Sequence, residues 1–505
     1  MFINIRKIIH LRVIFILCFV LLFFSCENKV DQCFINNQDA LLEIEQIQKL
    51  LVATSPYTEL NNSKVLDSLN SFSNKIKQKG EKISKNDFSL HLKQILSGLG
   101  DRHFFLENVG KCNQDKKYYL PFGLAPWKDN NAIALVKAGK GKFSFFLKNY
   151  PYLTHVEDQS LIEFLHQYDP ENKLAPKFPS LALGVEKMNE FYKIKKGLNV
   201  GDKMRFTFAS KDLKSDSTIV LKLVESKNKW RDIYDYSLFE ENDSNQLMFK
   251  SYDNNIAYIK VPKMYSYSED AEYFQLLKRK MQSLKNTNAL IIDIRNNSGG
   301  NRDLIDFFTT YLVTPNELKV VNLAKYKGKI SKDIEKNLNS RGLYSYGQFK
   351  NIRAKQAIDD FMKSFHPSIR INEKSYSEYF YMVLNNKVKE TPTSLYYDKP
   401  VYILTNEMTF SAASVFASVF KGINNIKIAG VATDGSSGMS NTYNLNYSNI
   451  QFNLSSMISF QKNGDLFDGV GTFPDIEIQR SIDQILGNEE HQLTTLLKEI
   501  NKNIK

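Results

Sequence analysis

Apolar residues recur at helical spacing in two stretches near the start of the chain. The segment ALLEIEQIQKLLV, residues 40–52, places them on one helical face. The segment DFSLHLKQILSGLG, residues 87–100, repeats the pattern and ends at a glycine stop. We expect residues 38–118 to form a small helical cap.

The pattern changes to short strands over residues 119–228. NAIALVKA at 131–138 and STIVLKLVES at 217–226 have strand-like apolar content, and a Gly-Asp turn precedes alternating positions in residues 197–210. This region is expected to be a small β-rich domain with one or two helices.

From residue 255 onward, apolar strands alternate with helices, which predicts an α/β core with a largely parallel sheet. Its active site is expected at the carboxyl ends of the strands. We assign the core to residues 229–485 and a C-terminal helix to residues 486–505. Residues 320–395 have a less regular pattern, which indicates an insertion or lid within the core.

The N-terminus has the features of an export signal. A basic start is followed by an apolar run from Val13 to Phe24, which is short for a membrane span and typical of a signal peptide. The following LFFSC resembles a bacterial lipobox, in which Cys26 becomes the lipidated first residue. Residues 1–25 are then the signal and residues 26–37 a tether to the cell envelope. The alternative is a short membrane anchor, and both interpretations predict an exported, tethered protein.

Composition and charge exclude several classes of protein. The 505 residues are 42% hydrophobic and 24% charged, which is typical of a globular protein and not of a disordered chain. The formal net charge is +12, but the lysines are spread evenly. Zinc-ligand spacing and basic helices with interleaved aromatics are absent from the sequence. A nucleic-acid partner, a metal and a cofactor are therefore not expected.

Two of the four cysteines remain after the N-terminal segment is assigned. Cys18 lies in the signal and Cys26 is the lipidation candidate, which leaves Cys33 and Cys112. An oxidising compartment would permit a disulfide between them. The sequence does not show that they meet.

Ser411 is the first candidate for chemistry. It follows a buried strand and opens a helix, where free N–H groups and the positive end of the helix dipole favour a nucleophile. The N–H of Ala412 can then help to hold an oxyanion. The alternative is that Ser411 only caps the helix, which is the commoner role of serine at this position.

Three further segments supply candidate partners for Ser411. DIRNNSGGN ends in Gly299-Gly300, whose N–H groups can form the other half of an oxyanion hole, although an ordinary glycine turn fits as well. His103 in GLGDRHFFLE is a candidate base, and its alternative is the commoner role of a lone histidine, a surface or satisfied core residue. Asp468 in GDLFDGVGTFPDIEI is a candidate acid that orients the histidine, and its alternative is a solvated turn residue.

The order of these segments resembles the C-terminal-processing (tail-specific) serine peptidase family. The resemblance rests on NALIIDIRNNSGG, VYILTNEMTFSAAS, IAGVATDG and DGVGTFPDIEI, together with LSGLGDRH, and it covers roughly residues 38–485. It implies a crotonase/ClpP-like catalytic core with an N-terminal helical cap and a PDZ-like domain at residues 119–228. A PDZ-like domain in this family binds substrate tails by strand addition. The segment LPFGLAPWKD has no recognisable carboxylate-binding loop.

The resemblance also implies roles for single residues. One branch of the family uses a Ser-Lys pair, but Ser436 occupies the lysine position here. The tricorn-core and interphotoreceptor retinoid-binding-like branch uses a histidine and an acid, and His103 and Asp468 match those positions. The aspartate is one methylene shorter than the usual glutamate, and Arg102 replaces a small residue and can compete for the carboxylate of Asp468.

Two functions follow from this interpretation. The first is an exported serine peptidase in which Ser411 attacks a peptide bond, His103 is the base, Asp468 orients it, and Gly300 and Ala412 hold the oxyanion. The second is a catalytically silent relative that binds a peptide or lipid-like ligand in the same cleft. A purely structural surface protein does not explain why all the motif segments occur together.

Overall fold

The computed structural model describes most of the chain after the N-terminal segment. The expected lipidation site Cys26 lies outside the described residues, as does Cys112, whereas Cys33 is disulfide-bonded. The described residues are 33–60, 64–78, 80–109, 117–128, 131–139, 141–168, 177–195, 197–225, 248–386 and 396–504.

A six-stranded sheet forms the centre of the molecule, in the order β11-β12-β13-β17-β18-β22. Only β11 runs antiparallel to its neighbour, and the other pairings are parallel. Every residue of β13 and β17 is buried, as expected for parallel strands covered on both faces. The predicted α/β fold is therefore confirmed. The strands are β11 (Met248–Tyr252), β12 (Ile256–Lys260), β13 (Ala289–Asp293), β17 (Val401–Thr405), β18 (Ile426–Gly430) and β22 (Ile476–Glu477).

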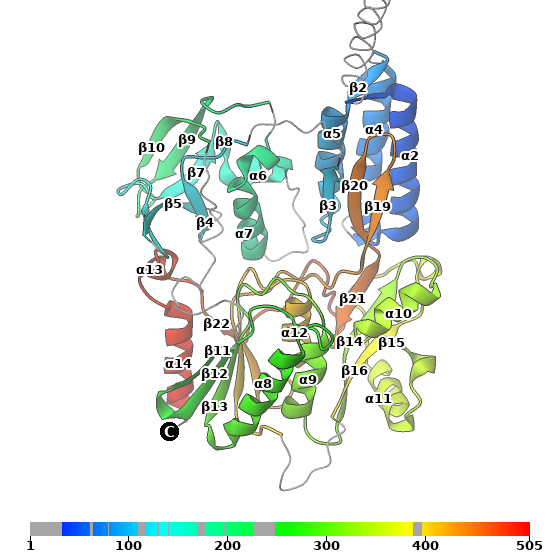
Figure 1. The fold of residues 1–505 in the computed structure, drawn as a ribbon, viewed down its shortest axis with the longest axis vertical. Helices are drawn as coiled ribbons and strands as arrows, with labels where there is room; N and C mark the ends of the chain where they lie inside the picture. Colours follow the sequence, from blue (N-terminus) through cyan, green and yellow to red (C-terminus); the bar gives the residue numbers. More distant parts are fainter. Residues whose placement is uncertain are drawn as a thin grey trace, which may run out of the picture.

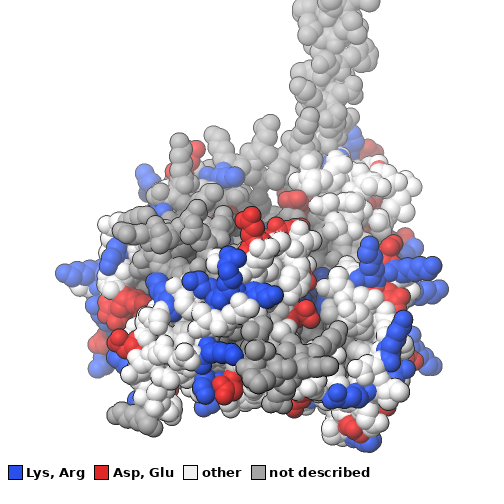
Figure 2. Space-filling view, turned by 60° about the horizontal axis from the view of Figure 1, so that its bottom comes forward, with Lys and Arg blue, Asp and Glu red and all other residues white. Residues whose placement is uncertain are grey.

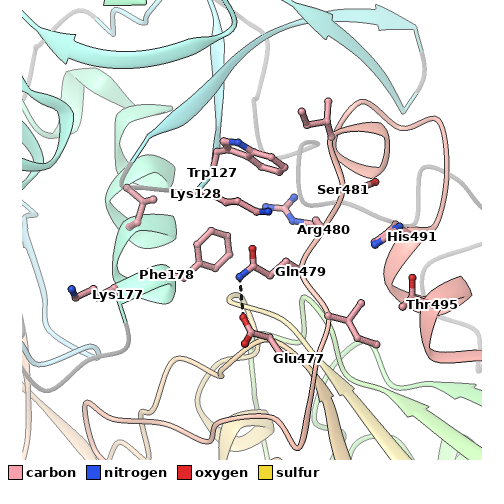
Figure 3. Close-up of a pocket in the computed structure, with 13 residues that line it drawn as sticks. Trp127, Lys128, Lys177, Phe178, Glu477, Gln479, Arg480, Ser481, His491 and Thr495 are labelled. Carbon is pink, nitrogen blue, oxygen red and sulfur yellow. Dashed lines mark hydrogen bonds between the residues drawn. The ribbon is translucent and has the colours of Figure 1, made fainter. Parts of the chain in front are cut away.

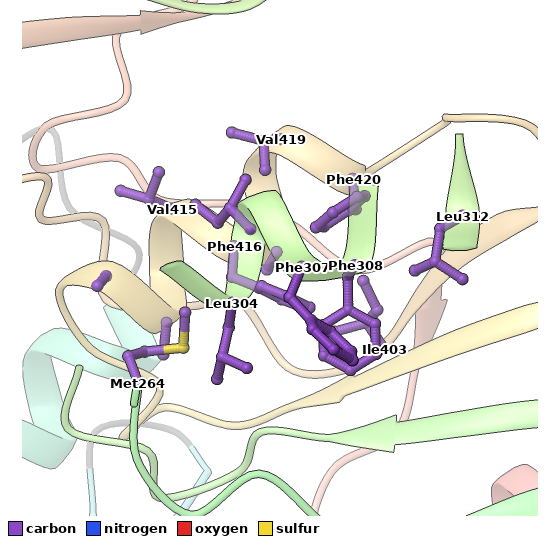
Figure 4. Close-up of a cluster of buried hydrophobic side chains, with 14 of the residues drawn as sticks. Met264, Leu304, Phe307, Phe308, Leu312, Ile403, Val415, Phe416, Val419 and Phe420 are labelled. Atoms are coloured by element: carbon purple, nitrogen blue, oxygen red, sulfur yellow. The ribbon is translucent and has the colours of Figure 1, made fainter. Parts of the chain in front are cut away.

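Helices cover both faces of this sheet (Figure 1). Alternate residues of β13 point to opposite sides: Leu290 and Ile292 join the hydrophobic cluster under α9 and α12, whereas Ile291 packs with α14. Figure 4 shows Phe308 of α9 and Phe416 of α12 within the first cluster. These helices are α8 (Ala271–Gln282), α9 (Asp303–Leu312), α12 (Ala412–Phe420) and α14 (His491–Asn503), whereas α13 (Ile482–Ile485) packs against the β-rich region.

The region expected to be irregular, residues 320–395, folds largely into a second sheet in the order β15-β16-β14-β21. Two buried lysines, one within β14 and one just after it, concealed the strand pattern in the sequence. Lys325 pairs with Glu373, and Lys327 pairs with Glu59 at 2.6 Å, so that burying these charges is compensated. The elements are β14 (Leu318–Tyr326), α10 (Lys332–Ser340), β15 (Tyr344–Ser345), α11 (Ile352–Met362), β16 (Phe380–Asn385) and β21 (Met457–Gln461).

The β-rich region lies beside the cap and above the core in Figure 1. Its main sheet has the order β10-β9-β7-β5-β4, with β6 and β8 paired at the side. The segment LTHVEDQSLIEFL forms the expected strand, turn and helix. The elements are β4 (Gly123–Pro126), β5 (Ala132–Gly139), β6 (Lys142–Phe145), β7 (Tyr152–Val156), β8 (Gln159–Ser160), α6 (Leu161–Tyr168), α7 (Lys177–Met188), β9 (Lys203–Ala209) and β10 (Asp216–Lys222).

The outer edge of β4 is closed by the chain itself. Helix α7 packs against β4, and Gly184 lets it approach Leu165 of α6 closely. Just beyond α7, the side chain of Asn189 accepts a hydrogen bond from the Leu124 N–H at 2.9 Å and donates one to the Leu124 carbonyl at 3.2 Å. A single carboxamide thus takes both backbone groups that an added strand would need at this residue.

The helical cap draws on two distant parts of the sequence. A three-stranded sheet, β19-β20-β3, packs on its helices, and two of those strands lie far beyond the expected residues 38–118. Glu43 of α2 accepts hydrogen bonds from the N–H groups of Tyr447 and Ser448 in the turn of this sheet. The elements are β1 (Phe34–Asn36), α2 (Asn37–Thr54), α3 (Tyr57–Leu60), α4 (Val65–Gln78), β2 (Lys82–Ser84), α5 (Lys85–Ser97), β3 (Phe105–Asn108), β19 (Ser440–Leu445) and β20 (Ile450–Ser455).

Charged side chains are interspersed over the face shown in Figure 2, where basic and acidic groups lie among uncharged residues. This agrees with the even spread of lysines in the sequence. Among the described residues, the helices are all too short or too polar to cross a membrane.

Candidate active site

Ser411 stands in a strained turn between β17 and α12. Its backbone angles are φ 51° and ψ −125°, in a region that non-glycine residues seldom adopt. Such strain occurs where the surrounding structure fixes a side chain for a function. The Ser411 side chain forms no capping hydrogen bond to α12, so the capping alternative does not account for the serine.

The imidazole of His103 faces this hydroxyl although 308 residues separate the two side chains in sequence. Its Nε2 lies 3.2 Å from Ser411 Oγ, which is within the reach of a nucleophile and its base. The backbone N–H of His103 donates to Asp101 Oδ1 at 2.9 Å. Asp101 in turn accepts hydrogen bonds from the N–H and hydroxyl of Ser455, so the end of β20 holds the histidine segment in place.

Two contacts enclose the His103 ring. The Phe410 ring lies against it with a centroid separation of 4.9 Å. On another side the backbone of Gly438 approaches so closely that a Cβ there would lie 2.2 Å from the imidazole. Glycine is therefore the residue that this packing accommodates at position 438. The close contact leaves the His103 ring little freedom to turn.

The double glycine reaches the nucleophile as the sequence suggested. A Cβ on Gly299 would lie 2.7 Å from Ser411 Cβ, so the two turns are in direct contact. The Gly299 N–H donates to Asn297 Oδ1, which leaves Gly300 as the glycine donor for an oxyanion. Ala412 is the first residue of α12, where an N–H has no partner within the helix.

Asp468 does not orient His103, contrary to the sequence prediction. Its Oδ1 accepts hydrogen bonds from the N–H and hydroxyl of Ser437, and its Oδ2 accepts them from the N–H and hydroxyl of Ser459. His103 Nδ1 is buried without a hydrogen-bond partner in the described part of the chain. The shorter aspartate is thus held by two serines and does not contact the imidazole.

Arg102 does not pair with Asp468 either. Its Nε lies 3.2 Å from Asp434 Oδ2 in a buried ion pair. The other oxygen of Asp434 accepts the hydroxyl of Ser436 at 2.8 Å, and Ser436 Oγ accepts the N–H of Ser411 at 3.3 Å. The residue at the family's lysine position therefore supports the backbone of the nucleophile.

The surroundings of His103 favour its neutral form. Burial, and after it the guanidinium groups of Arg341, Arg302 and Arg102, lowers the pKa of its imidazole to about 4. At neutral pH, His103 is therefore uncharged and can accept a proton. The three aspartates around the site are also buried: burial raises the pKa of Asp101 to about 6 and raises that of Asp434 and Asp468.

Sequence reasoning missed several of these residues. Arg302 and Arg341 carry no motif, and Arg341 comes from the region interpreted as irregular. Ser437 and Gly438 lie just after the IAGVATDG motif, where the sequence drew attention only to Ser436 at the lysine position. The aspartate in that segment, Asp434, was a signal that could have been used, because a buried arginine such as Arg102 needs a carboxylate.

A separate hollow of about 1090 Å³ lies between the β-rich region and the C-terminal segment. Figure 3 shows Trp127, Phe178 and Arg480 around it. Arg480 Nη2 lies 2.6 Å from Glu407 Oε1, and Glu407 belongs to the segment that leads to Ser411. This ion pair links one residue of the hollow to that segment.

Comparison with known families decides what kind of domain carries this site. Residues 255–478 match the model of Peptidase family S41. These residues form a domain of peptidase family S41. The S41 segment contains Gly300, Ser411 and Asp468, whereas His103 lies outside it and reaches the site from the cap.

Solved structures share the fold over nearly the whole chain. Mature CPAF superimposes with a TM-score of 0.64 at 15% identity, covering 92% of this chain and 98% of that one. A serine-to-alanine mutant of CPAF gives 0.65 at 14% identity, with 93% and 98% covered. CPAF complexed with lactacystin gives 0.58 at 16% identity, with 92% and 99% covered. At these identities the likeness establishes the fold alone.

One relative is similar in sequence. An uncharacterized protein of Chlamydia muridarum (strain MoPn / Nigg) is 27% identical over 213 residues, which are 38% of this chain. The match spans about a third of the relative's own length (34%).

Proposed function

We propose that this S41 family member is a serine peptidase whose nucleophile is Ser411 and whose base is His103. The observation that carries the proposal is the 3.2 Å approach of His103 Nε2 to the hydroxyl of a serine in a strained turn. Its substrates are peptide bonds of proteins or peptides, in keeping with the family.

The geometry supports a two-stage hydrolysis. His103 Nε2 takes the proton of the Ser411 hydroxyl while Oγ attacks the carbonyl carbon of the substrate. The N–H groups of Gly300 and Ala412 stabilise the resulting oxyanion. The C–N bond then breaks, and the amine leaves with the proton from His103. Water enters, gives its proton to His103 and hydrolyses the acyl-enzyme, which restores the serine.

Asp468 has a different role in this proposal from the one expected. Because its carboxylate accepts hydrogen bonds from Ser437 and Ser459, it fixes the backbone beside His103 and does not touch the ring. The site is thus a Ser-His pair with a buried acid behind it.

The test is covalent labelling of Ser411 by a fluorophosphonate probe, combined with turnover of casein. The wild type should label and cleave, and Ser411→Ala should do neither. His103→Ala should lose on the order of a thousandfold in turnover, as removal of a general base typically does. If His103→Ala keeps its full rate, the assignment of the base is wrong.

A catalytically silent relative is the second candidate, and one observation favours it. His103 Nδ1 is buried without an acceptor among the described residues, so the imidazolium formed during catalysis would lack the stabilisation that an acid provides. In that case the wild type would neither label nor cleave, although the fold would be intact by circular dichroism.

We also propose that the protein is exported and anchored in the bacterial envelope by a lipid on Cys26. The support is the sequence of basic start, short apolar run and Ser-Cys. Globomycin or Cys26→Ser should leave unprocessed precursor. A mature N-terminus at another residue would contradict the proposal.

A further inference from the structure

The turn at Ser437 and Gly438 is the part of the site that touches most of the other components. Gly438 packs on the His103 ring, and Ser437 holds Asp468 through its N–H and hydroxyl. The preceding residue, Ser436, accepts the N–H of the nucleophile Ser411. A shift of this turn would therefore move the base and the support of the nucleophile together.

Two arginines donate hydrogen bonds to this turn, one from the core and one from the region of the second sheet. Arg341 Nη1 donates to the carbonyl of Ser437 at 3.2 Å and also to the carbonyl of Gly438. Arg302 Nη2 donates to the same Ser437 carbonyl at 3.1 Å, and its Nη1 donates to the Arg341 carbonyl at 3.2 Å. Arg302 immediately precedes α9, and Arg341 immediately follows α10, so the turn is clamped between two separate elements.

A histidine base normally needs something to fix its ring, and here that group is not a carboxylate. The carboxylate of Asp468 accepts hydrogen bonds from Ser437 and Ser459. His103 Nδ1 has no acceptor in the described part of the chain. What does contact the ring is Phe410 on one side and Gly438 on another. The orientation of the base therefore depends on how firmly Gly438 is held.

We propose that Arg341 is a positioning residue for His103: it clamps the Ser437–Gly438 turn against the imidazole and so does the orienting that an acid does in a Ser-His-Asp triad. This inference rests on the proposed function and adds a residue to it. It also gives the region between residues 320 and 395 a role, because that region delivers Arg341 to the site.

The charge of Arg341 acts on the same ring as its hydrogen bonds do. Among the charged groups it is the largest cause of the lowered pKa of His103, ahead of Arg302 and Arg102. Removing the charge of Arg341 should raise the pKa of His103 toward its ordinary value. Disturbing only the hydrogen bonds from Arg341 Nη1 to Ser437 and Gly438 should not raise it. The charged groups around the ring are Arg102, Arg302, Arg341, Asp101, Asp434 and Asp468.

Two substitutions separate charge from geometry. Arg341→Met removes both, whereas Arg341→Lys keeps the charge but loses the planar guanidinium, whose Nε donates to Asn337 Oδ1 at 3.2 Å and so fixes the position of Nη1. Both should lower the turnover number about tenfold to a hundredfold with KM changed less than about threefold, because a misplaced base affects the chemical step. Only Arg341→Met should move the acid limb of the pH profile upward. The control is Arg370→Met, an exposed arginine of the same region, which should match the wild type.

A second measurement does not depend on activity. Histidine labelled with ¹³C at Cε1 reports the titration of His103 by NMR in the full chain, assigned with His103→Gln. The His103 resonance should titrate near pH 4 in the wild type and in Arg341→Lys, and at higher pH in Arg341→Met.

The two readouts distinguish the possible failures. If Arg341→Met matches Arg370→Met in both titration and turnover, the positioning role is refuted. If no variant, wild type included, is active but the titration shifts as expected, the peptidase proposal fails while the contact between Arg341 and the His103 environment stands.

Discussion

At the scale of single residues, the site depends on a histidine kept neutral by its surroundings. Burial and three guanidinium groups lower the pKa of His103 to about 4. A base must be unprotonated to accept the serine proton, so activity is present above this pKa and is lost as the pH falls through it.

The pH profile tests this directly. We expect casein turnover and probe labelling to stay nearly constant from pH 8 down to about pH 5 and to fall near the pKa of about 4. An ordinary histidine would instead lose activity around pH 6.5. An acid limb at about 6.5, in a protein that remains folded at that pH, would show that neither burial nor the arginines lower the pKa of the ring.

Gly438 offers a second test at this scale. In Gly438→Ala the new methyl group would lie 2.2 Å from the imidazole, so His103 must move away from Ser411. We expect probe labelling to fall about a hundredfold or more, as misplacement of a catalytic group does. The matched control is Gly347→Ala, where nothing lies within 4 Å of the added Cβ. Equal labelling of the two variants would mean that the ring is not held by this glycine.

Asp468→Asn tests the revised role of the acid. The carboxamide has one acceptor oxygen for four donors from Ser437 and Ser459, so we expect the free energy of unfolding to fall by about 1–3 kcal/mol. Turnover should fall less than in His103→Ala, because Asp468 does not touch the ring. Urea unfolding and casein turnover are measured for both variants. Equal losses of turnover would contradict the revised role and favour a direct action of Asp468 on His103.

At the scale of the elements, the sequence predicted strands and helices well where the apolar pattern was continuous. The sequence indicated β13 and β17 because both are nearly continuous apolar runs. It indicated α12 because small and apolar residues follow β17. The meeting of His103 with Ser411 followed from the motifs of a known family and not from the local pattern.

The sequence failed where charges are buried or where distant segments combine. Lys325 at the end of β14 and Lys327 just after it made this part of the sequence look polar and exposed. In the structure both lysines are buried, and their charges are neutralised by Glu373 and Glu59. The family motif placed Asp468 beside His103. The sequence has no signature for the hydrogen bonds that its carboxylate accepts from Ser437 and Ser459. Only coordinates reveal which of several nearby donors a carboxylate accepts from.

The closed edge of β4 gives a prediction for the β-rich region. In Asn189→Ala the N–H and carbonyl of Leu124 lose their partner, and we expect a destabilisation of about 1–3 kcal/mol. Asn189→Asp keeps the acceptor but not the donor, so it should show a smaller loss. Thermal unfolding followed by circular dichroism measures both. If Asn189→Ala unfolds at the wild-type temperature, the carboxamide does not hold this edge.

At the scale of the whole molecule, the site is assembled from regions that fold as different layers. His103 comes from the cap, Ser411 from the core, and Arg341 from the second sheet. The cap itself needs β19 and β20, which are close to the C-terminal end of the chain. The catalytic arrangement therefore exists only when all these layers are in contact.

The separation of 308 residues between base and nucleophile has a consequence for synthesis of the protein. Contacts of long range in sequence form late, because the intervening chain must be complete and folded first. A nascent chain emerging from the ribosome holds His103 long before Ser411 and the Ser437–Gly438 turn are made. Until then the Ser-His pair of the proposed function is incomplete, so we expect a nascent chain to have no peptidase activity.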